Sequence, residues 1–445
     1  MHFWKDLFSP SDAIGAAQTL IWFNFMLGLT PFRLRTGDDG QQRTLHISQL
    51  GYLNTLLQVI FFMYCFIHSL AEQASIVGFF FKSEISQIGD TLQKFIGLLG
   101  MLTLFGISLS ECRVIVSLCN TIGAVDRRFH NLGVAFNYQY IMKLTHLKMF
   151  LVITLNVSYM SSCFWMLFHN DIWPTFQAMI TFFMPHVFLL SVVVLFSTFL
   201  FRLQQHFGLI NKVLKKLAHQ WDNSIVKPMP KQRSLQCLDS FSMYTIVTNN
   251  PCEIIQESME IHHMICDAAS TANKYFTYQL LTIISIAFLI IVFDAYYVLE
   301  TLLGKSAHES KFKTVEFVTF FSCQMILYVI AIISIVEGSN RAIKKSEKTG
   351  GIVHSLLNKA KNAELKEKLQ QFSLQLLHLK IHFTAAGLFN IDRTLYFTIS
   401  GALTTYLIIL LQFTNSNAPE RPFAPMEEND TMPIRSLVSN LTVAG

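Results

Sequence analysis

Charged residues are scarce in this sequence: only 14% of its 445 residues are Asp, Glu, Lys or Arg, whereas a soluble domain carries about 25%. The charges that remain avoid several apolar stretches of about 20 residues and crowd into the segments between them. Hydrophobic residues make up 52% of the chain. This shortage of charge excludes a soluble globular protein, and its distribution predicts a chain that crosses a lipid bilayer several times.

Motifs for catalysis, cofactors and metals are also missing. The eight cysteines form no Cys-x-x-Cys pair, so the sequence predicts neither a zinc site nor a disulfide framework. There is no phosphate-binding Gly-x-x-x-x-Gly-Lys loop, no His-Glu-x-x-His and no Gly-x-Ser-x-Gly. The first residues do not form a secretory signal peptide. We therefore expect no enzyme, no cofactor and no metal, and also no nucleic-acid-binding domain, internal repeat or β region.

Seven apolar segments are long enough to cross about 30 Å of hydrocarbon as helices at 1.5 Å per residue. They are residues 50–70, 94–111, 146–168, 173–201, 275–299, 314–336 and 394–413. A shorter run, 13–29, contains polar residues and is followed by Pro31. It is interpreted as an interfacial or re-entrant segment, with an eighth span as the alternative. The predicted fold class is therefore an all-α integral membrane protein with seven transmembrane helices.

The positive charges orient these spans. Of the 34 lysine and arginine residues, 27 fall on the side that receives the N-terminus and 7 on the other. Because cytosolic segments are enriched in these residues, we expect a cytosolic N-terminus and an extracellular C-terminus. Two N-glycosylation acceptors in the tail, Asn429 and Asn440, agree with that orientation because they require the outer side.

The two long cytosolic loops carry apolar residues at helical spacing, so we expect them to extend the membrane helices into an anchor bundle below the membrane. Only 222–250, which includes Pro228 and Pro230, is predicted to be a flexible insert. The expected order of segments is a cytosolic or interfacial N-terminus (1–49), transmembrane helices 1–4 (50–201), a cytosolic helical loop (202–274), transmembrane helices 5–6 (275–336), anchor helices (337–393), transmembrane helix 7 (394–413) and an extracellular tail (414–445).

Two other classes of membrane protein are alternatives, the G-protein-coupled receptors and the secondary transporters. Asp126-Arg127-Arg128 resembles the acid–Arg–aromatic motif of G-protein-coupled receptors, but it follows the second span and has Arg128 at the aromatic position. The cytosolic N-terminus is also opposite to that class. A secondary transporter is expected to have inverted repeats and helices broken at mid-membrane; Pro185 is the clearest break in the predicted spans. Both classes remain alternatives.

The segment at the last span carries the most specific pattern. Gly387, Phe389 and Asp392 precede it in a Gly-x-Phe-x-x-Asp pattern, and it ends with Thr405-Tyr406, five hydrophobic residues and Gln412-Phe413. This segment resembles the insect gustatory receptor family, and within it the lineage linked to bitter compounds, ribonucleosides and light or heat responses. The resemblance implies a chemosensory receptor in the plasma membrane of sensory neurons. It also implies a ligand-gated, nonselective cation channel of four identical or related subunits, opened by a small-molecule tastant.

In such a channel the resemblance assigns the pore lining to the seventh helices. Thr405, Ile408 and Gln412 share one face of that helix at 3.6 residues per turn. Four copies around an axis would present rings of hydroxyl, apolar and amide groups, and an apolar ring closes a pore by excluding water. The predicted orientation puts Gln412 and Phe413 at the extracellular mouth. The alternative is a packed helix with one interfacial glutamine.

Polar and aromatic residues inside the spans are the candidates for a ligand pocket. Asp294 is ionisable at membrane depth, which is costly and therefore points to function, and Tyr297 lies on the same helical face. The resemblance implies a ligand pocket in the outer half of each subunit. Its candidate lining residues are Tyr159, Trp165, Gln177, His186, Asp294, Tyr297 and Gln324. The alternatives are an interfacial aromatic belt and a structural role for Asp294.

Overall fold

A computed structural model describes residues 10, 12–36, 43–72, 76, 84–223, 235–239, 242–245, 250–303 and 314–416. Seven helices of this part are long and apolar enough to cross a membrane. They are α4 (Gln49–Ala71), α5 (Glu84–Ser110), α7 (Tyr138–His169), α8 (Phe176–Asn223), α9 (Pro251–Leu302), α10 (Thr314–Lys359) and α12 (Thr394–Ser416). Each predicted span lies on one of them, in order, so the predicted count of seven is confirmed for the described residues.

The apolar run at 13–29 does not form an eighth spanning helix. It folds into two short helices, α2 (Ala13–Ala16) and α3 (Gln18–Met26), which lie against α6 (Cys112–Asn131) and α7. Gly28 then turns the chain with a φ of +75°, a backbone conformation that glycine adopts without steric cost. Its carbonyl accepts a hydrogen bond from the Thr55 hydroxyl on α4 at 2.7 Å, which fixes the turn against the first long helix.

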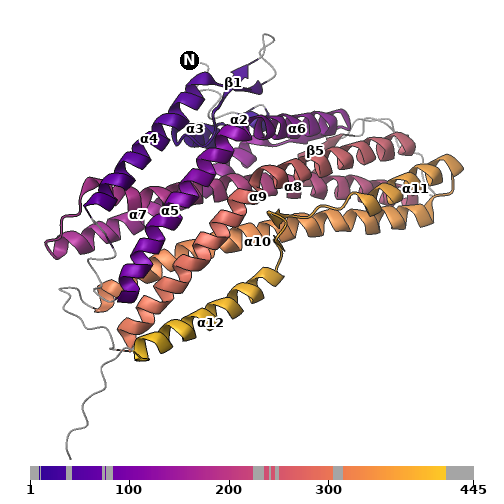
Figure 1. Ribbon diagram of the computed structural model, residues 1–445. Helices are drawn as coiled ribbons and strands as arrows, with labels where there is room; N and C mark the ends of the chain where they lie inside the picture. Colours follow the sequence, from indigo (N-terminus) through magenta and orange to yellow (C-terminus); the bar gives the residue numbers. More distant parts are fainter. Residues whose placement is uncertain are drawn as a thin grey trace, which may run out of the picture.

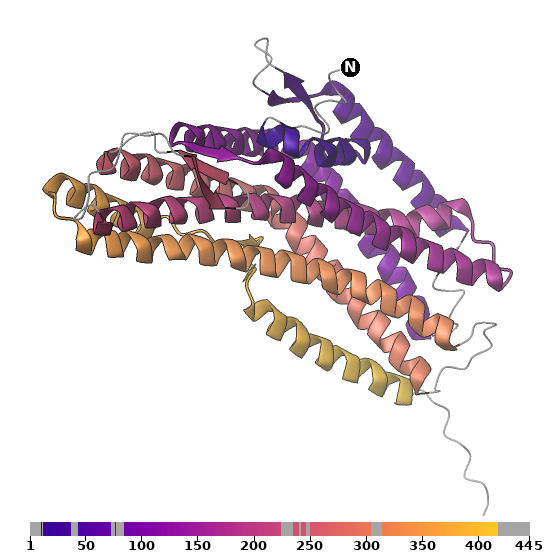
Figure 2. The same ribbon diagram turned by 180° about the vertical axis from the view of Figure 1, so that it is seen from behind.

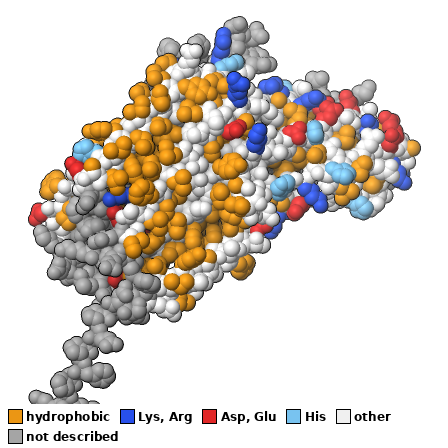
Figure 3. Space-filling view, viewed as in Figure 1, with side chains coloured by type: hydrophobic (Ala, Val, Ile, Leu, Met, Phe, Trp, Pro, Cys, Tyr) orange, Lys and Arg blue, Asp and Glu red, His pale blue; other side chains and the backbone are white. Residues whose placement is uncertain are grey.

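Three helices are much longer than a membrane is thick. α9 has 52 residues, which corresponds to about 78 Å at 1.5 Å per residue, and α8 and α10 have 48 and 46. Together with α11 (Ala363–His378) they form one end of the elongated molecule (Figures 1 and 2). Charged side chains gather at that end, whereas apolar side chains are spread over much of the middle of the face in Figure 3. The long loops therefore continue the membrane helices into a polar helical bundle.

The helices differ greatly in how deeply they are packed. In the most apolar stretch of α8, 72% of residues are buried, against 6% in α12. The buried core follows α8, α9 and α10, and α12 lies alone along one side (Figures 1 and 2), packed chiefly on α9. The helix that sequence reasoning assigned to the pore is thus the least covered spanning helix of the described chain.

The expectation of no β structure is wrong in detail, because short antiparallel strands connect the helices. They are β1 (Phe32–Thr36) with β2 (Arg43–Ile47), β3 (Val134–Phe136) with β5 (Ser242–Thr245) and β4 (Leu235–Asp239) in the order β3-β5-β4, and β6 (Thr384–Ala385) with β7 (Phe389–Asn390). Strands of two to five residues carry too little alternation to be recognised in a sequence. β4 and β5 lie within the predicted flexible insert 222–250, where β4 pairs with β5 and β5 pairs with β3. These strands depend on pairing with a distant segment, which the local sequence does not indicate.

Candidate ligand pocket and last helix

A hydrogen-bonded pair of buried side chains joins α8 to α10. The His186 Nδ1–H donates to the Phe182 carbonyl at 2.8 Å, which leaves Nε2 as the acceptor. The Gln324 amide nitrogen lies 3.1 Å from that Nε2 and donates to it. Both residues are buried, and the Gln324 amide oxygen has no hydrogen-bond partner. The pair therefore presents one buried, unused acceptor.

Aromatic rings surround this pair. The Tyr159 ring on α7 stacks on Phe320 with centroids 5.3 Å apart and lies 5.7 Å from the His186 ring. On the other side the His186 ring lies 5.5 Å from Tyr328. The hydroxyls of Tyr159 and Tyr328 are buried and make no hydrogen bond. Aromatic walls with a few unpaired polar groups are typical of a small-molecule site.

Asp294 on α9 completes the cluster. Its side chain is buried, its Oδ2 has no hydrogen-bond partner, and it interacts electrostatically with the hydroxyl groups of Tyr159 and Tyr328. Tyr297, one helical turn further, packs its ring 5.1 Å from Phe321. A polar group buried without a partner costs free energy, so several groups of this cluster are left unsatisfied by the chain itself.

A small cavity of about 30 Å³ opens beside His186 and Tyr328. Its opposite wall belongs to α5, where Lys94 pairs with Asp90 at 3.0 Å and the buried Gln93 amide nitrogen has no partner. Sequence reasoning missed these three residues and Tyr328. In the sequence Lys94 indicates only where a span begins. Tyr328 is one aromatic residue among many on its helix, so nothing in the sequence distinguishes it as a pocket residue.

Two of the predicted pocket residues lie apart from the cluster. Trp165 is 71% exposed and stacks on His169 at the surface of α7. Gln177 is half-buried near the start of α8, and its carbonyl accepts from Thr181 at 2.8 Å. The other five predicted residues come together between α7, α8, α9 and α10. They are Tyr159, His186, Asp294, Tyr297 and Gln324.

The last spanning helix, α12, has two distinct faces. Leu407, Leu410 and Leu411 pack against the same hydrophobic cluster that contains Tyr159 and Tyr297. The opposite face is exposed in the single chain and carries the predicted pore residues Thr405, Ile408 and Gln412. Tyr406 is also exposed, and its ring meets Phe288 edge-on at 5.9 Å. Phe413 lies in α12, but its side chain, like Asn429 and Asn440, is outside the described part of the chain.

The residues that precede α12 form a tight hairpin held by α9. Ala386 and Gly387 occupy its turn with φ of 51° and 72°, the left-handed region that favours glycine. Thr277 on α9 donates its hydroxyl proton to the Thr384 carbonyl at 3.0 Å and accepts from the Ala386 N–H at 2.7 Å. The Phe389 ring is partly buried against the main core. The glycine and phenylalanine of the motif therefore fix where the last helix begins.

Exposed ion pairs connect the start of α12 to α10. Arg393 donates to both carboxylate oxygens of Glu337, at 2.7 and 3.1 Å, and Arg341 donates to the same carboxylate at 3.2 Å. The Asp392 carboxylate accepts from the Thr394 backbone N–H at 2.8 Å, one of the N–H groups that a helix start leaves without an intrahelical partner. The acidic residue of the motif thus caps the helix.

Replacing Asp392 by alanine is expected to lower the free energy of unfolding by about 1 kcal/mol, because the first N–H of α12 loses its acceptor. Asp392→Asn keeps an acceptor oxygen and is expected to recover most of that loss. The measurement is the thermal unfolding midpoint of the purified chain in detergent. Equal destabilisation by both substitutions would show that the capping bond is not the reason.

A buried charge network, which sequence reasoning did not anticipate, lies below the span of α8. The Asp126 carboxylate on α6 accepts from Arg202 at 2.6 Å and from His206 at 2.7 Å, both on α8, and from the Tyr138 hydroxyl at 3.1 Å. Burial alone would raise the pKa of Asp126, but the Arg202 charge and the His206 hydrogen bond outweigh it and hold that pKa below its usual value of 3.8.

The seven long apolar helices are those of a multi-pass membrane protein. Residues 17–417 match the family described as 7tm Chemosensory receptor. The chain belongs to this family, and within it to the insect gustatory receptors, which are receptors and not enzymes.

Two relatives from Drosophila melanogaster and one solved fold support this assignment. The proposed gustatory receptor 28b is 55% identical over 401 residues, which covers 90% of this chain and 85% of the relative. The proposed gustatory receptor 28a is 34% identical over 431 residues, which covers 91% of this chain and 93% of the relative. The olfactory receptor OR5 of the insect Machilis hrabei, solved in complex with eugenol, has a similar fold with a TM-score of 0.55 at 13% identity, covering 89% of this chain and 97% of that one.

Proposed function

We propose that this gustatory receptor is a ligand-gated, nonselective cation channel of four subunits, opened by a small molecule that binds in the outer half of the helical bundle. Each subunit has a cytosolic N-terminus and an extracellular C-terminus, and the channel resides in the plasma membrane of sensory neurons. The observation that carries the proposal is the two-faced α12. One face packs on the polar pocket, and the other, with Thr405, Ile408 and Gln412, faces away from its own subunit.

The exposed face suits a pore better than lipid. The Thr405 hydroxyl donates to the Gly401 carbonyl at 3.0 Å, so it is satisfied without a partner subunit, while its oxygen remains available to ions. Gln412 offers an amide oxygen that replaces part of an ion's hydration, and Ile408 supplies the apolar ring that excludes water from a closed pore. Segments that meet lipid are predominantly apolar, so the polar groups of Thr405 and Gln412 on one exposed face favour the pore.

The pocket and the pore face are mechanically connected in this proposal. Leu407, Leu410 and Leu411 of α12 share a hydrophobic cluster with Tyr159 and Tyr297 of the pocket. A ligand that inserts between the pocket rings displaces this cluster, and the change reaches α12 through direct packing. Because packed interfaces switch between discrete arrangements rather than deform continuously, a small shift in the pocket is enough to rotate or tilt the pore-lining helix.

The ligand is expected to satisfy the buried groups that have no hydrogen-bond partner within the chain. The tyrosine hydroxyls at 159 and 328 donate, and the Gln324 amide oxygen accepts. A mainly planar, aromatic or heterocyclic molecule with both donors and acceptors fits walls of this kind. The relationship to gustatory receptors and the fold shared with a eugenol-binding olfactory receptor support a small organic ligand.

The experiment is to reconstitute the purified chain alone in planar bilayers and apply bitter compounds and ribonucleosides. A current that an agonist evokes and that reverses near zero voltage is expected. Absence of current across the panel, with the chain demonstrably tetrameric, would overturn the channel proposal. An N-terminal tag that is stained on intact, unpermeabilised cells would overturn the orientation and would favour a G-protein-coupled receptor. Concentrative uptake without current would favour a transporter.

Removing the buried amide in the pocket tests where the ligand binds. Gln324→Leu is expected to weaken agonist potency by about tenfold, because a buried polar contact to the ligand is lost together with the bond to His186. The matched control is Trp165→Phe on the exposed side of α7, which should leave potency within about twofold, since it touches none of the pocket groups. The readout is the agonist concentration for half-maximal current. A larger effect of the control would move the site to the outer face of α7.

A further inference from the structure

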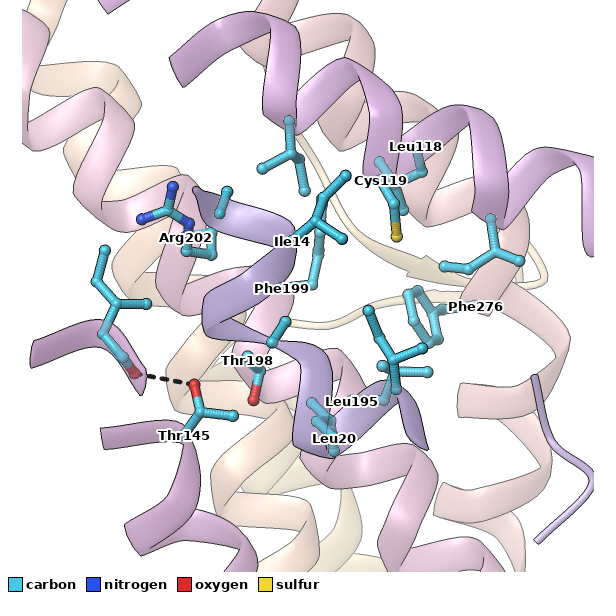
Figure 4. Close-up of a pocket in the computed structure, with 16 residues that line it drawn as sticks. Ile14, Leu20, Leu118, Cys119, Thr145, Leu195, Thr198, Phe199, Arg202 and Phe276 are labelled. Atoms are coloured by element: carbon cyan, nitrogen blue, oxygen red, sulfur yellow. Dashed lines mark hydrogen bonds between the residues drawn. The ribbon is translucent and has the colours of Figure 1, made fainter. Parts of the chain in front are cut away.

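Two apolar cavities adjoin the short helix α3, and Leu20 lines both of them. The first, drawn in Figure 4, has a volume of about 90 Å³. Since a benzene ring occupies a cavity of about 150 Å³, the first cavity is too small for a ring. The second has a volume of about 200 Å³ and is therefore large enough for a six-membered ring with about two further heavy atoms.

This second cavity lies between α3, α7 and α8, and its walls are apolar apart from Asn156 and Ser191. Ile153 and Val157 on its α7 side are 40% and 55% exposed, although α7 is one of the spanning helices. Because exposed apolar side chains of a spanning helix face lipid, the cavity opens sideways toward the bilayer.

The cavity is separate from the proposed ligand pocket and lies behind it. His186 and Val187 are neighbours on α8, but His186 is directed to α10, whereas Val187 lines the cavity beside α3. On α7, the Tyr159 ring stacks on Phe320 of α10, and Asn156, three residues earlier, lines the cavity. An occupant of the cavity would therefore contact none of the pocket groups that bond to α10.

The amide of Asn156 is the unusual feature of the cavity wall. The residue is only 7% exposed, and its Nδ2 donates to the Val152 carbonyl at 2.9 Å, which fixes the end of the amide that carries the oxygen. Asn24 on α3 makes the same bond four residues back, but its oxygen is sealed inside the protein without a partner. The Asn156 oxygen also accepts no hydrogen bond from the described chain, but it remains accessible. It is a buried acceptor that an outside molecule can reach.

The other lining residues decide the chemistry of an occupant. The Ser191 hydroxyl already donates to the Val187 carbonyl at 2.7 Å, and none of the described residues that line the cavity is charged. A charged occupant would therefore be buried without a counter-charge. A pure hydrocarbon would leave the Asn156 oxygen unpaired. A neutral molecule with a hydroxyl group avoids both costs.

We propose that this cavity is a second binding site, for a small neutral ring compound with a hydroxyl group, such as a cyclic alcohol or a phenol. The hydroxyl donates its proton to Asn156 Oδ1, and the ring packs among the aliphatic side chains of α7 and α8. Such a compound dissolves in the membrane and enters through the open side at Ile153 and Val157. The site goes beyond the proposed function, because it shares no lining residue with the cavity beside His186.

The test uses the full-length purified chain in nanodiscs of pure phospholipid and a cyclopentanol that carries a diazirine on its ring. This probe has about the size that the cavity admits. Photolysis is expected to label peptides of α7 and α8 around Asn156 and Ser191. Labelling of α9 or α10 instead would place the probe in the outer pocket and overturn the proposal, and so would labelling spread evenly over the spanning helices.

Competition by unlabelled compounds tests the hydrogen bond from the ligand side. Cyclohexanol is expected to displace the probe. Methylcyclohexane has the same size but no hydroxyl, and methoxycyclohexane has an acceptor but no donor. Both should require membrane concentrations at least about threefold higher, because they cannot donate to Asn156. Equal potency of all three compounds would show that the cavity takes any hydrocarbon, lipid chains included, and would overturn the proposal.

Substitutions test the same bond from the protein side. Asn156→Leu keeps the size of the side chain but removes the oxygen, and it is expected to raise the probe concentration for half-maximal labelling about three- to tenfold. The matched control is Ser191→Ala in the same cavity, which should change it less than about twofold, because that hydroxyl is already bonded to the backbone. Equal losses in the two variants would contradict the assigned contact. Since labelling requires no current, failure here is distinguishable from failure of the channel proposal.

Discussion

Replacing Asp126 by alanine is expected to lower the free energy of unfolding by about 3–5 kcal/mol, because it leaves the buried Arg202 guanidinium without its counter-charge. Asp126 is also the acceptor for His206 and Tyr138, so one substitution removes the hydrogen bonds that link α6 to α8 and to the start of α7. The thermal unfolding midpoint of the purified chain in detergent is the measurement. At pH 7 the carboxylate of the wild type is fully ionised, so the whole difference in stability should be observed at that pH.

Two further variants make this result specific. Asp267→Ala removes a carboxylate that pairs with His263 on an exposed surface, and it should change stability by less than about 0.5 kcal/mol. The double variant Asp126→Leu with Arg202→Met replaces the pair by apolar groups and should recover most of the loss. If the double variant is as unstable as the single one, the uncompensated charge is not the cause.

The same pair predicts a dependence on pH. The folded-state pKa of Asp126 is lowered relative to its usual value of 3.8, so the carboxylate contributes stability that is present above pH 3.8 and is lost as the pH falls through the folded pKa. The difference in stability between the wild type and Asp126→Asn should therefore shrink on acidification below about pH 4. A constant difference from pH 7 to pH 3 would contradict the linkage.

Replacing Ile408 by asparagine is expected to open the channel without agonist. In the proposed closed pore the four Ile408 side chains form an apolar ring, and burying such a side chain contributes about 1.5–3 kcal/mol per copy. Because 1.4 kcal/mol corresponds to a factor of ten in an equilibrium, loss of this contribution should raise the basal current at least about tenfold. Polar side chains at the constriction also allow it to be wetted.

Tyr406 provides the control for this effect. It is exposed to almost the same extent in the single chain, 52% against 50% for Ile408, but it lies two residues away and is rotated by about 200° around the helix. Tyr406→Asn should therefore leave the basal current near the wild-type level. Equal basal currents in the two variants, at equal surface expression, would mean that the face chosen here does not line the pore.

The spans were predictable because their signal is local. About 20 apolar residues and a bias in flanking charge fix a membrane helix without reference to its neighbours, and all seven segments lie on described helices. The motif before α12 was equally readable, because Gly387 and Asp392 act through their own backbone turn and helix start. Residues whose role depends on adjacent sequence can be interpreted from sequence alone.

The sites were less predictable because helix packing creates them. Asp294 is recognisable as an ionisable residue at membrane depth, but its interaction with Tyr328 of α10 is not. Gln93 of α5 meets the cavity beside His186 only through helix packing, which no periodicity reveals. Trp165 was included for its chemistry, but it turns outward from α7. Asp126 and Arg202 are 76 residues apart. Both lie in segments predicted to be cytosolic, where charged residues are common, so the sequence does not indicate that these two form a buried pair.

The most direct test of the central claim is cysteine accessibility along α12 while agonist-evoked current is recorded. A charged, water-soluble thiol reagent is applied from outside to channels carrying cysteine at Thr405, Ile408 or Gln412, or at the inward-facing positions Leu407 and Leu411. The pore proposal predicts agonist-dependent block at 405, 408 and 412, relative to the wild type, and none at 407 and 411. Current that persists unmodified at the first three positions, or block at the two leucine positions alone, would contradict it.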